Sequence, residues 1–449
     1  MANVIKLRKG LDINLKGKAA NKLSDAGACD IYGLVPDDFT GLKPKVVVKE
    51  GDVVKAGDAL FVNKLYPEVR FVSPVSGTVA GVVRGERRKV LSVQVKADKE
   101  QQYADFGKKD VKTLSAEQVV KALTESGLFA FFRQRPYDVT ACPNDKPKAI
   151  FVSSFSDMPL AADFEVALKG NEADFQTGID AMSRIANVYL GVKPGASNAL
   201  MQAKNATVTV FDGPCPAGNV GVQINHVSPI NKGEIVWTIG AEELIFVGRL
   251  FNKGIVDLRR VIAVAGSEIK APEYVNVKVG QQIGSIVNGR ISSERNVRII
   301  NGNPLVGRKA DKDCFLGAHT TEITVIPEGD DVNEAFGWIM PRFNDFSTSR
   351  TYFSWLMGKK KEYTLDARVK GGERHMIMSN EYDKVFPMDI MPEYLIKAII
   401  TGDIDKMEAL GIYEVAPEDF AVCEFVDSSK LELQRIVREG LDMLRKENE

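Results

Sequence analysis

The clearest alternation of apolar and polar positions lies over residues 42–96, where short runs of this pattern are separated by tight turns. Gly51-Asp52 and Gly57-Asp58 mark two of the turns, because glycine supplies a positive φ and aspartate bonds the nearby backbone. The residues expected to point inward from the strands between these turns are Val53, Ala59 and Leu60. Residues 77–95 repeat the strand, turn, strand order. Two such halves predict a small flattened barrel.

The middle of the chain alternates strand patterns with helix patterns, which is typical of a mostly parallel α/β sheet. Ser115 and Gln118 form a capping box that begins a helix, and this helix is expected to end at Gly127. A longer helix is predicted over residues 176–190. Its apolar face would contain Ile179, Met182, Ile185, Ala186 and Tyr189. The other elements predicted here are strands at 148–153 and 205–211 and an amphipathic helix at 240–251.

The two ends of the chain carry different patterns. The alternation of Leu11, Ile13 and Leu15 predicts a strand near the beginning. The pattern over residues 258–326 predicts a strand pair, a short helix and a further strand, which is the order of a β-grasp domain. From residue 330 the pattern becomes mostly helical, with Pro392 in the first turn of one helix. The last two predicted helices are 404–410, which ends at Gly411, and 431–444.

These patterns together predict a multidomain α/β protein, and four domains are expected. They are an N-terminal region at 1–103 that contains the barrel at about 42–96, a Rossmann-like α/β domain at 104–257, a β-grasp domain of the soluble-ligand-binding (SLBB) type at 258–329, and a helical domain at 330–449. The barrel resembles the biotinyl/lipoyl family of barrel-sandwich hybrids, which carry E-G-D-x-V-x-x-G-D-x-L followed by P-x-x-G-x-V. In a carrier of that family a lysine at the hairpin tip receives the cofactor. Here the tip falls near Tyr66 and Pro67 and Lys64 is off-centre, so a solvated lysine is favoured over covalent modification.

Composition and charge exclude several classes of protein. The chain has 449 residues, of which 44% are apolar and 27% charged, as in ordinary soluble proteins. A net charge of −1 argues against a nucleic-acid partner, because phosphate neutralisation needs a basic excess. No run approaches the roughly 18 apolar residues of a membrane span, and the first residues have no long apolar core. Any role at a membrane is therefore expected to be peripheral.

The residues that usually hold metals or carry out nucleophilic catalysis are scattered. The five cysteines are Cys29, Cys142, Cys215, Cys314 and Cys423, and the three histidines are His226, His319 and His375. No CxxC pair occurs, so no metal site or iron–sulfur cluster is predicted. The spacing suits free thiols in a reducing cytoplasm. No nucleophile with a partner base can be recognised, and no catalytic residue is assigned.

The order of the domains resembles three related redox subunits. They are the NADH-binding flavoprotein subunit of respiratory complex I, the C subunit of the Rnf complex, and the A subunits of the sodium-translocating NADH:quinone reductase (NqrA). The first two families carry S-G-L-R-G-R-G-G-A-G-F-P, whose glycines let nucleotide phosphates approach the backbone. In the aligned stretch 126–136, phenylalanines and arginines replace those glycines and fill the space. The cluster-binding cysteines of those families are reduced here to Cys423.

Loss of both sites is what distinguishes the NqrA family, which also carries G-x-H-P-A-G-x-x-G-x-x-I-x-H. The positions kept here are Gly213, Pro216, Ala217, Gly218, Gly221, Ile224 and His226. The sequence departs from this pattern at Cys215 and Asn225. We therefore build no mechanism on these positions.

The resemblance implies a peripheral subunit on the cytoplasmic face of the inner cell membrane, in a six-subunit pump. That complex moves electrons from NADH to ubiquinone and exports sodium. Flavin and iron–sulfur centres are expected on other subunits. The partners implied are the other five subunits, especially the membrane subunit that binds quinone and flavin, together with ubiquinone itself. No covalently bound cofactor is expected on this chain.

One cluster of residues could bind the quinone in the former flavin space. We expect Phe129, Phe131 and Phe132 to stack on a quinone ring, and Arg133 and Arg135 to stabilise its reduced oxygens. The competing interpretation is that the phenylalanines simply fill the vacated site as core. Other functions also stay open: a purely structural scaffold, a biotin or lipoate carrier, and an active NADH dehydrogenase with an unusual flavin site.

Overall fold

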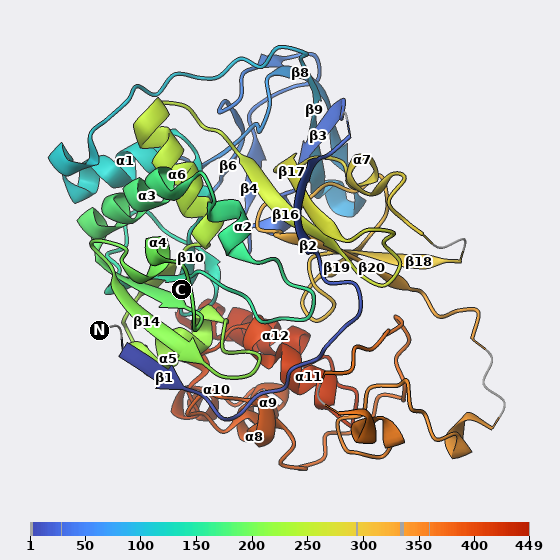
Figure 1. The fold of residues 1–449 in the computed structure, drawn as a ribbon. Coiled ribbons are helices and arrows are strands. Elements are labelled where there is room, and N and C mark those ends of the chain that lie inside the picture. The colour runs from blue at the N-terminus through green and yellow to red at the C-terminus, as the bar shows by residue number, and fades with distance from the viewer. Residues whose placement is uncertain (1–2, 28, 293–294, 333–335, 359, 449) are drawn as a thin grey trace.

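The structure is a computed structural model that describes residues 3–27, 29–292, 295–332, 336–358 and 360–448. Over these residues the strands form four sheets, one each of seven, six, four and three strands. The helices surround the seven-stranded sheet and form a separate group near the C-terminus (Figure 1). None of the helices in these ranges is both long enough and apolar enough to cross a membrane.

The barrel is made of two small antiparallel sheets, with strand orders β3-β9-β8-β5 and β4-β6-β7. The strands are β3 (Ile31–Leu34), β4 (Pro44–Val46), β5 (Val53–Val54), β6 (Ala59–Asn63), β7 (Arg70–Val72), β8 (Gly77–Arg84) and β9 (Val90–Ala97). The predicted turns are confirmed: φ is +88° at Gly51 and +99° at Gly57. The carboxylates of Asp52 and Asp58 accept hydrogen bonds of 2.7 Å from the backbone N–H groups of Lys49 and Lys55.

One inward-facing residue of the barrel was predicted wrongly. Val53 is 79% exposed, whereas Val54 is 5% exposed and joins the core with Leu60. Neighbouring residues of a strand point to opposite faces, so only one of the two valines can face inward. The pairing of β5 with β8 puts Val54 opposite Gly77 and selects Val54 as the inner residue.

The central α/β sheet has the order β1-β14-β13-β12-β15-β10-β11. In this order, the neighbouring strands from β1 to β15 pair in parallel. Strand β10 is antiparallel to both of its neighbours, β15 and β11. Its strands are β1 (Asn3–Lys6), β10 (Arg133–Arg135), β11 (Val139–Thr140), β12 (Ala149–Ser153), β13 (Asn187–Val192), β14 (Thr207–Asp212) and β15 (Val236–Thr238). Its helices are α1 (Ala116–Glu125), α2 (Phe164–Leu168), α3 (Glu172–Ile185), α4 (Asn198–Met201), α5 (Val220–Val227) and α6 (Ala241–Lys253). Helices α3 and α6 pack against each other (Figure 1), and the capping box of Ser115 and Gln118 begins α1 as predicted.

Two predicted elements near this sheet were wrong. The helix expected at 176–190 ends at Ile185, and Tyr189 lies on β13, where it stacks on Phe151. Parallel pairing of β13 with both β12 and β14 outweighs the continuing helical spacing. The strand expected at 11–15 is reduced to a single bridge between Leu15 and Tyr363, although Ile13 and Leu15 are buried.

The six-stranded sheet has the order β19-β18-β20-β16-β17-β2. Its strands are β2 (Ala20–Asp25), β16 (Arg259–Ala265), β17 (Glu273–Lys278), β18 (Val297–Asn301), β19 (Arg308–Ala310) and β20 (Glu322–Pro327), and its helix is α7 (Ile283–Val287). Strand β16 pairs with β17 in antiparallel and with β20 in parallel direction, as a β-grasp arrangement requires. The edge strand β2 comes from the N-terminal region, just as β1 completes the α/β sheet. The first 25 residues therefore tie two distant sheets together.

The C-terminal helices form their own apolar core, which also includes Phe211 and Val222 of the α/β unit. They are α8 (Tyr382–Val385), α9 (Pro392–Thr401), α10 (Ile404–Ala409), α11 (Ala421–Val426) and α12 (Leu433–Asn448). Pro392 occupies the first turn of α9, and Gly411 follows α10 with a φ of +90°, as expected. The described residues between 336 and 381 contain 3₁₀ turns at Gly337–Ile339 and Phe353–Met357, joined by irregular segments.

Candidate functional site

A cavity of about 360 Å³ lies at the carboxyl edge of the α/β sheet. Its walls include the residues that follow β12 and β15, the start of α6, and residues from β10, the β-grasp unit and the C-terminal unit. The chain runs from β12 to β13 on one side of the sheet and later adds β15 on the other side. This reversal is the topological switch point at which α/β sheets commonly bind ligands. The cavity is therefore the candidate functional site.

Two of the predicted aromatic residues lie behind this cavity and do not line it. Phe129 and Phe132 are fully buried and stack on each other with ring centroids 5.2 Å apart. Both rings meet Trp237 of β15 edge-on, at 5.3 Å and 5.9 Å. The pair therefore packs as core against the neighbouring strand.

Phe131 does line the cavity, although only 5% of it is exposed. Its ring makes edge contacts with Phe246 and with His319, in both cases with centroids 5.7 Å apart. The 3₁₀ turn at Leu128–Phe131 explains the difference from Phe129 and Phe132, because its tight winding sends successive side chains in different directions.

The two predicted arginines, Arg133 and Arg135, both line the cavity but in different states. Arg135 is 1% exposed and lies 3.8 Å from Asp138, 3.3 Å from Glu418 and 3.4 Å from Asp419. Burial lowers the pKa of Arg135, but the three carboxylates outweigh it and raise the pKa above the ordinary value. The Arg133 side chain is 34% exposed, and Asp138 lies 3.9 Å away. Arg133 is thus the more accessible cation for a bound molecule.

A second buried cluster, which the sequence did not reveal, adjoins the cavity on α6 and β16. Arg260 donates to Glu242 at 3.0 Å, to Glu243 at 2.8 Å and to the Ala318 carbonyl at 2.7 Å. Burial alone would raise the pKa of Glu243, but Arg260 and His319 lower it to about 2. The sequence feature that could have indicated this cluster is the pair Glu242-Glu243 in the first turn of a helix. Sequence reasoning missed it because acidic residues in a first turn are usually solvent-exposed dipole partners.

The cavity also contains three titratable groups whose pKa values are shifted. Burial and the adjacent Asp419 raise the pKa of Glu418 to about 7. Burial raises the pKa of Glu322 as well. Burial and the positive charge of Arg133 lower the pKa of His319. An accessible cation such as Arg133 can bind a molecule whose oxygens become negative.

The Gly213–Gly221 segment joins the α/β unit to the carboxylates that hold Arg135. It begins directly after β14, as predicted for a loop after a strand, and its last two residues open α5. The Asn219 amide donates to Asp419 at 3.2 Å. A Cβ on Gly221 would lie 2.3 Å from the Asp419 carboxylate, so only glycine allows this approach. Burial raises the pKa of the Cys215 thiol far above its ordinary value, which disfavours the reactive thiolate.

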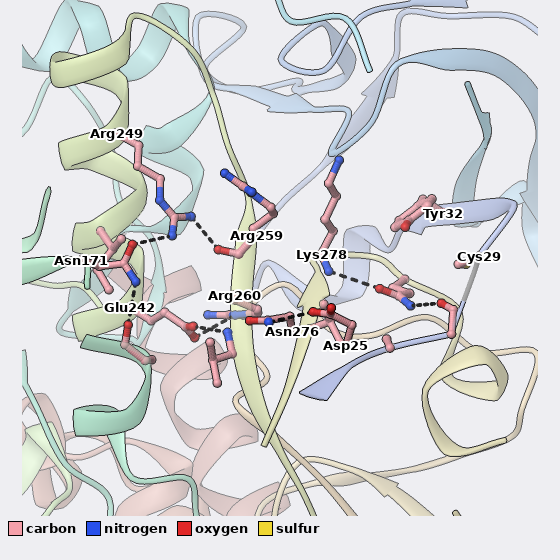
Figure 2. Close-up of a pocket in the computed structure, with 17 residues that line it drawn as sticks. Asp25, Cys29, Tyr32, Asn171, Glu242, Arg249, Arg259, Arg260, Asn276 and Lys278 are labelled. Carbon is pink, nitrogen blue, oxygen red and sulfur yellow. Dashed lines mark hydrogen bonds and ion pairs between the residues drawn. The ribbon is translucent and has the colours of Figure 1, made fainter. Parts of the chain in front are cut away.

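A second cavity, of about 470 Å³, lies between α6 and β17 on the other side of Glu242 and Arg260 (Figure 2). Arg249 reaches it from α6, and Arg259 and Lys278 reach it from β16 and β17. Arg249 donates to the Asn171 side chain at 3.1 Å and to the Arg259 carbonyl at 2.7 Å. Burial lowers the pKa of Lys278, whose amine donates to Gln101 at 3.2 Å. None of the residues predicted for the site reaches this cavity.

The described residues contain no group of three or more His, Cys, Asp or Glu side chains that could hold a metal ion. The stretch 126–136 forms the 3₁₀ turn and β10. Phe131, Arg133 and Arg135 of this stretch line the cavity.

Family models match three parts of the chain. The "NqrA N-terminal barrel-sandwich hybrid domain" matches residues 5–98, the "NqrA second alpha/beta domain" residues 114–256, and the "NQRA C-terminal domain" residues 261–312. Together with the sheets described above, these matches confirm the predicted fold class of barrel-sandwich hybrid, α/β unit and β-grasp unit.

Several proteins are similar over the full length. The A subunit of the Na(+)-translocating NADH-quinone reductase from Haemophilus influenzae is 36% identical, and the similarity covers 99% of this chain and all of that protein. The proteins of the same name from Hahella chejuensis and Serratia proteamaculans are 35% identical, again over 99% of this chain. Among solved structures, an NAD+-reducing [NiFe]-hydrogenase aligns with 48% of this chain and 50% of its own chain, at 14% identity. Its TM-score of 0.34 is too low to support a conclusion.

Proposed function

The chain belongs to the NqrA family, the A subunits of the Na(+)-translocating NADH-quinone reductase, and from this premise we propose that it works as the A subunit of such a complex. The observation that carries the proposal is 36% identity over 99% of the chain and the whole of the H. influenzae protein. The complex would oxidise NADH, reduce ubiquinone to ubiquinol and export sodium. This chain would be a peripheral subunit on the cytoplasmic face of the inner membrane.

Within that complex the chain contributes quinone binding and assembly, and it carries no redox centre of its own. Two features of the sequence support this division of labour. Phenylalanines and arginines stand where the flavin-binding relatives have glycines, and Cys423 alone remains in the segment where those relatives bind an iron–sulfur cluster. Flavin and iron–sulfur centres would then belong to the other five subunits.

The proposed quinone site is the cavity at the carboxyl edge of the α/β sheet. The edge of Phe131 would contact the quinone ring, and Arg133 would donate hydrogen bonds to a quinone oxygen that gains charge on reduction. Arg135, which is paired with three carboxylates, would keep a positive charge at a fixed position in the cavity wall. Phe129 and Phe132 would support the wall from behind as packed core.

Titration of a short-chain, water-soluble ubiquinone into the isolated chain tests this site by calorimetry. Arg133→Ala should weaken binding about tenfold, which corresponds to about 1.4 kcal/mol. The matched control is Arg298→Ala. The Arg298 side chain is similarly exposed, at 29%, and is paired with Glu328, but it lies on β18 of the six-stranded sheet. Unchanged affinity in both Arg133→Ala and Phe131→Ala would put the quinone elsewhere.

The remaining interpretations give other results in the same preparation. A purely structural scaffold would show no saturable quinone binding. A biotin or lipoate carrier would show an adduct on Lys64 by intact mass, and Lys64 is exposed on the segment between β6 and β7. An NADH dehydrogenase with an unusual flavin site would purify as a yellow protein with stoichiometric flavin.

A further inference from the structure

The region 336–357, which we call the apolar lobe, exposes large apolar side chains at unusual density. Seven of them are between 49% and 69% exposed, namely Phe336, Ile339, Met340, Phe353, Trp355, Leu356 and Met357. The lobe is the orange segment at the lower right of Figure 1, which extends away from the α/β sheet. Folded monomers rarely expose a continuous apolar patch of this kind unless it binds something.

The lobe is held in shape by its own contacts. The Arg342 guanidinium lies over the Tyr352 ring at 5.3 Å and donates to the Gly337 carbonyl at 3.0 Å. The backbone N–H of Phe353 donates to the Pro341 carbonyl at 3.1 Å, and the Phe343 and Phe353 rings lie 6.0 Å apart. These contacts connect Gly337 at the first 3₁₀ turn with Tyr352 and Phe353 at the start of the second. The exposed apolar side chains therefore stand on a backbone that its own contacts support.

Basic side chains lie at the edge of the lobe and follow it in the chain. Residues 336–357 carry Arg342, Arg350 and Asp345 and so a net charge of +1, whereas the whole chain carries −1. Three lysines follow at 359–361, and the first of them lies outside the described residues. Arg342 is paired with Asp345 at 3.0 Å. Arg350 lies over the exposed Trp355 ring at 5.7 Å, and the Lys361 amine donates to the Asn344 side chain at 2.9 Å, so these two cations give the apolar surface a basic edge.

We propose that the apolar lobe docks on another subunit of the same complex, at a face that is apolar in the centre and acidic at its rim. The inference rests on the proposed function, because only a multi-subunit complex supplies that partner. Aromatic residues, methionine and arginine are enriched at such interfaces, and aromatic and arginine side chains dominate their energetics. The acidic rim follows from the basic edge formed by Arg350 and Lys361, since opposite charges steer and orient partners.

The backbone of the lobe favours a protein partner over lipid. Its irregular segments and 3₁₀ turns do not have the continuous hydrogen-bond ladder of a long helix or a sheet, and hydrocarbon cannot bond the peptide groups that such a ladder would satisfy. A protein face can satisfy them with its own donors and acceptors. A second copy of this chain would bring two basic edges together, which is unfavourable.

The test uses the affinity-tagged chain expressed together with the other subunits of the complex. The lobe variant is Trp355→Ser/Leu356→Ser/Met357→Ser. The control variant, Val53→Ser/Tyr394→Ser/Ile400→Ser, removes side chains that are 79%, 58% and 53% exposed on other surfaces. We expect the lobe variant to copurify at least tenfold less of the other subunits and the control to change by less than twofold. Both should keep the thermal midpoint of the parent chain.

Three results would overturn the proposal. Full copurification by the lobe variant would show that the surface is not the contact. Sedimentation of the parent chain alone with phosphatidylcholine–phosphatidylglycerol vesicles, lost in the lobe variant, would identify lipid as the occupant. A dimer of the parent chain in light scattering, dissociated in the lobe variant, would identify a second copy. Failure of the parent chain itself to copurify any of the other subunits would instead contradict the proposed function.

Discussion

The cavity and the apolar lobe depart from the usual distribution of residues in opposite ways. Around the cavity, the charged side chains of Arg135, Arg260 and Glu243 are at most 5% exposed. In the lobe, apolar side chains such as Leu356 and Phe336 are 60% and 69% exposed. Buried charges and exposed large apolar patches are both uncommon and both call for compensation.

The difference between the two regions is where that compensation comes from. Each of the buried cations has carboxylates of the same chain within 4 Å. The charges of Arg135 and Arg260 are therefore neutralised within the chain before any ligand binds. The exposed apolar side chains of the lobe are not covered within the described residues, and in our proposal another subunit covers them. The cavity thus needs no partner to balance its buried cations, whereas the lobe would.

The largest expected effect comes from removing one buried cation. Arg260→Met removes the main counter-charge of the buried Glu242 and Glu243, so the free energy of unfolding in urea should fall by about 3–5 kcal/mol. The triple variant Arg260→Met/Glu242→Gln/Glu243→Gln should recover most of the loss. The exposed Arg435, which pairs with Glu432 and Glu439, is the control. An equal loss in Arg435→Met would mean that burial is not the cause.

A smaller loss is expected where the glycine motif meets the carboxylates of the cavity. In Gly221→Ala the new methyl group would lie 2.3 Å from Asp419, which accepts from the Ala416 N–H at 2.9 Å and cannot move freely. The free energy of unfolding should fall by about 1–3 kcal/mol. Gly372→Ala is the control, because its methyl group would meet open space. Full stability of Gly221→Ala would show that Asp419 relaxes.

The charge of Glu418 should make stability depend on pH. The pKa of Glu418 is raised from 4.5 to about 7 in the folded chain. The stability that the protonated carboxyl contributes is therefore fully present below pH 4.5 and is lost as pH rises through 7. Glu418→Gln removes the charged form and should stabilise the chain at pH 8 by about 1 kcal/mol, a figure reduced for the partial exposure of the carboxyl. The gain should shrink at pH 5.5. A gain that is equal at both pH values would contradict the raised pKa.

The smallest effect is expected in the lobe. Leu356→Ala removes a side chain that is 60% exposed, so the free energy of unfolding should change by less than about 0.5 kcal/mol. Leu395→Ala in α9 removes a fully buried side chain of the same size, and a loss of about 2–5 kcal/mol is expected there. A large loss in Leu356→Ala would mean that the lobe packs against its own chain, which would weaken its role as an interface.

Prediction from the sequence succeeded where the cause was local. The turns at Gly51 and Gly57, the capping box at Ser115 and the helix start at Pro392 all depend on contacts within a few residues. Errors arose where distant strands decided the outcome. Tyr189 continued a helical spacing but lies on a central parallel strand, and Val53 faces solvent because β5 pairs with β8. The cluster of Arg260 with Glu242 and Glu243 was not found, because it joins a helix to a strand.

The sequence by itself determined the barrel turns, the order of the structural units and the replacement of glycines in the stretch 126–136, since these depend on residue type and local backbone chemistry. Only the tertiary structure decided that Phe131, Arg133 and Arg135 line a cavity while Phe129 and Phe132 pack behind it. It alone brought Asp419 from the C-terminal unit to Arg135 and Gly221. The reason is physical: the direction of a side chain and the neutralisation of a buried charge depend on partners hundreds of residues away, which no local pattern encodes.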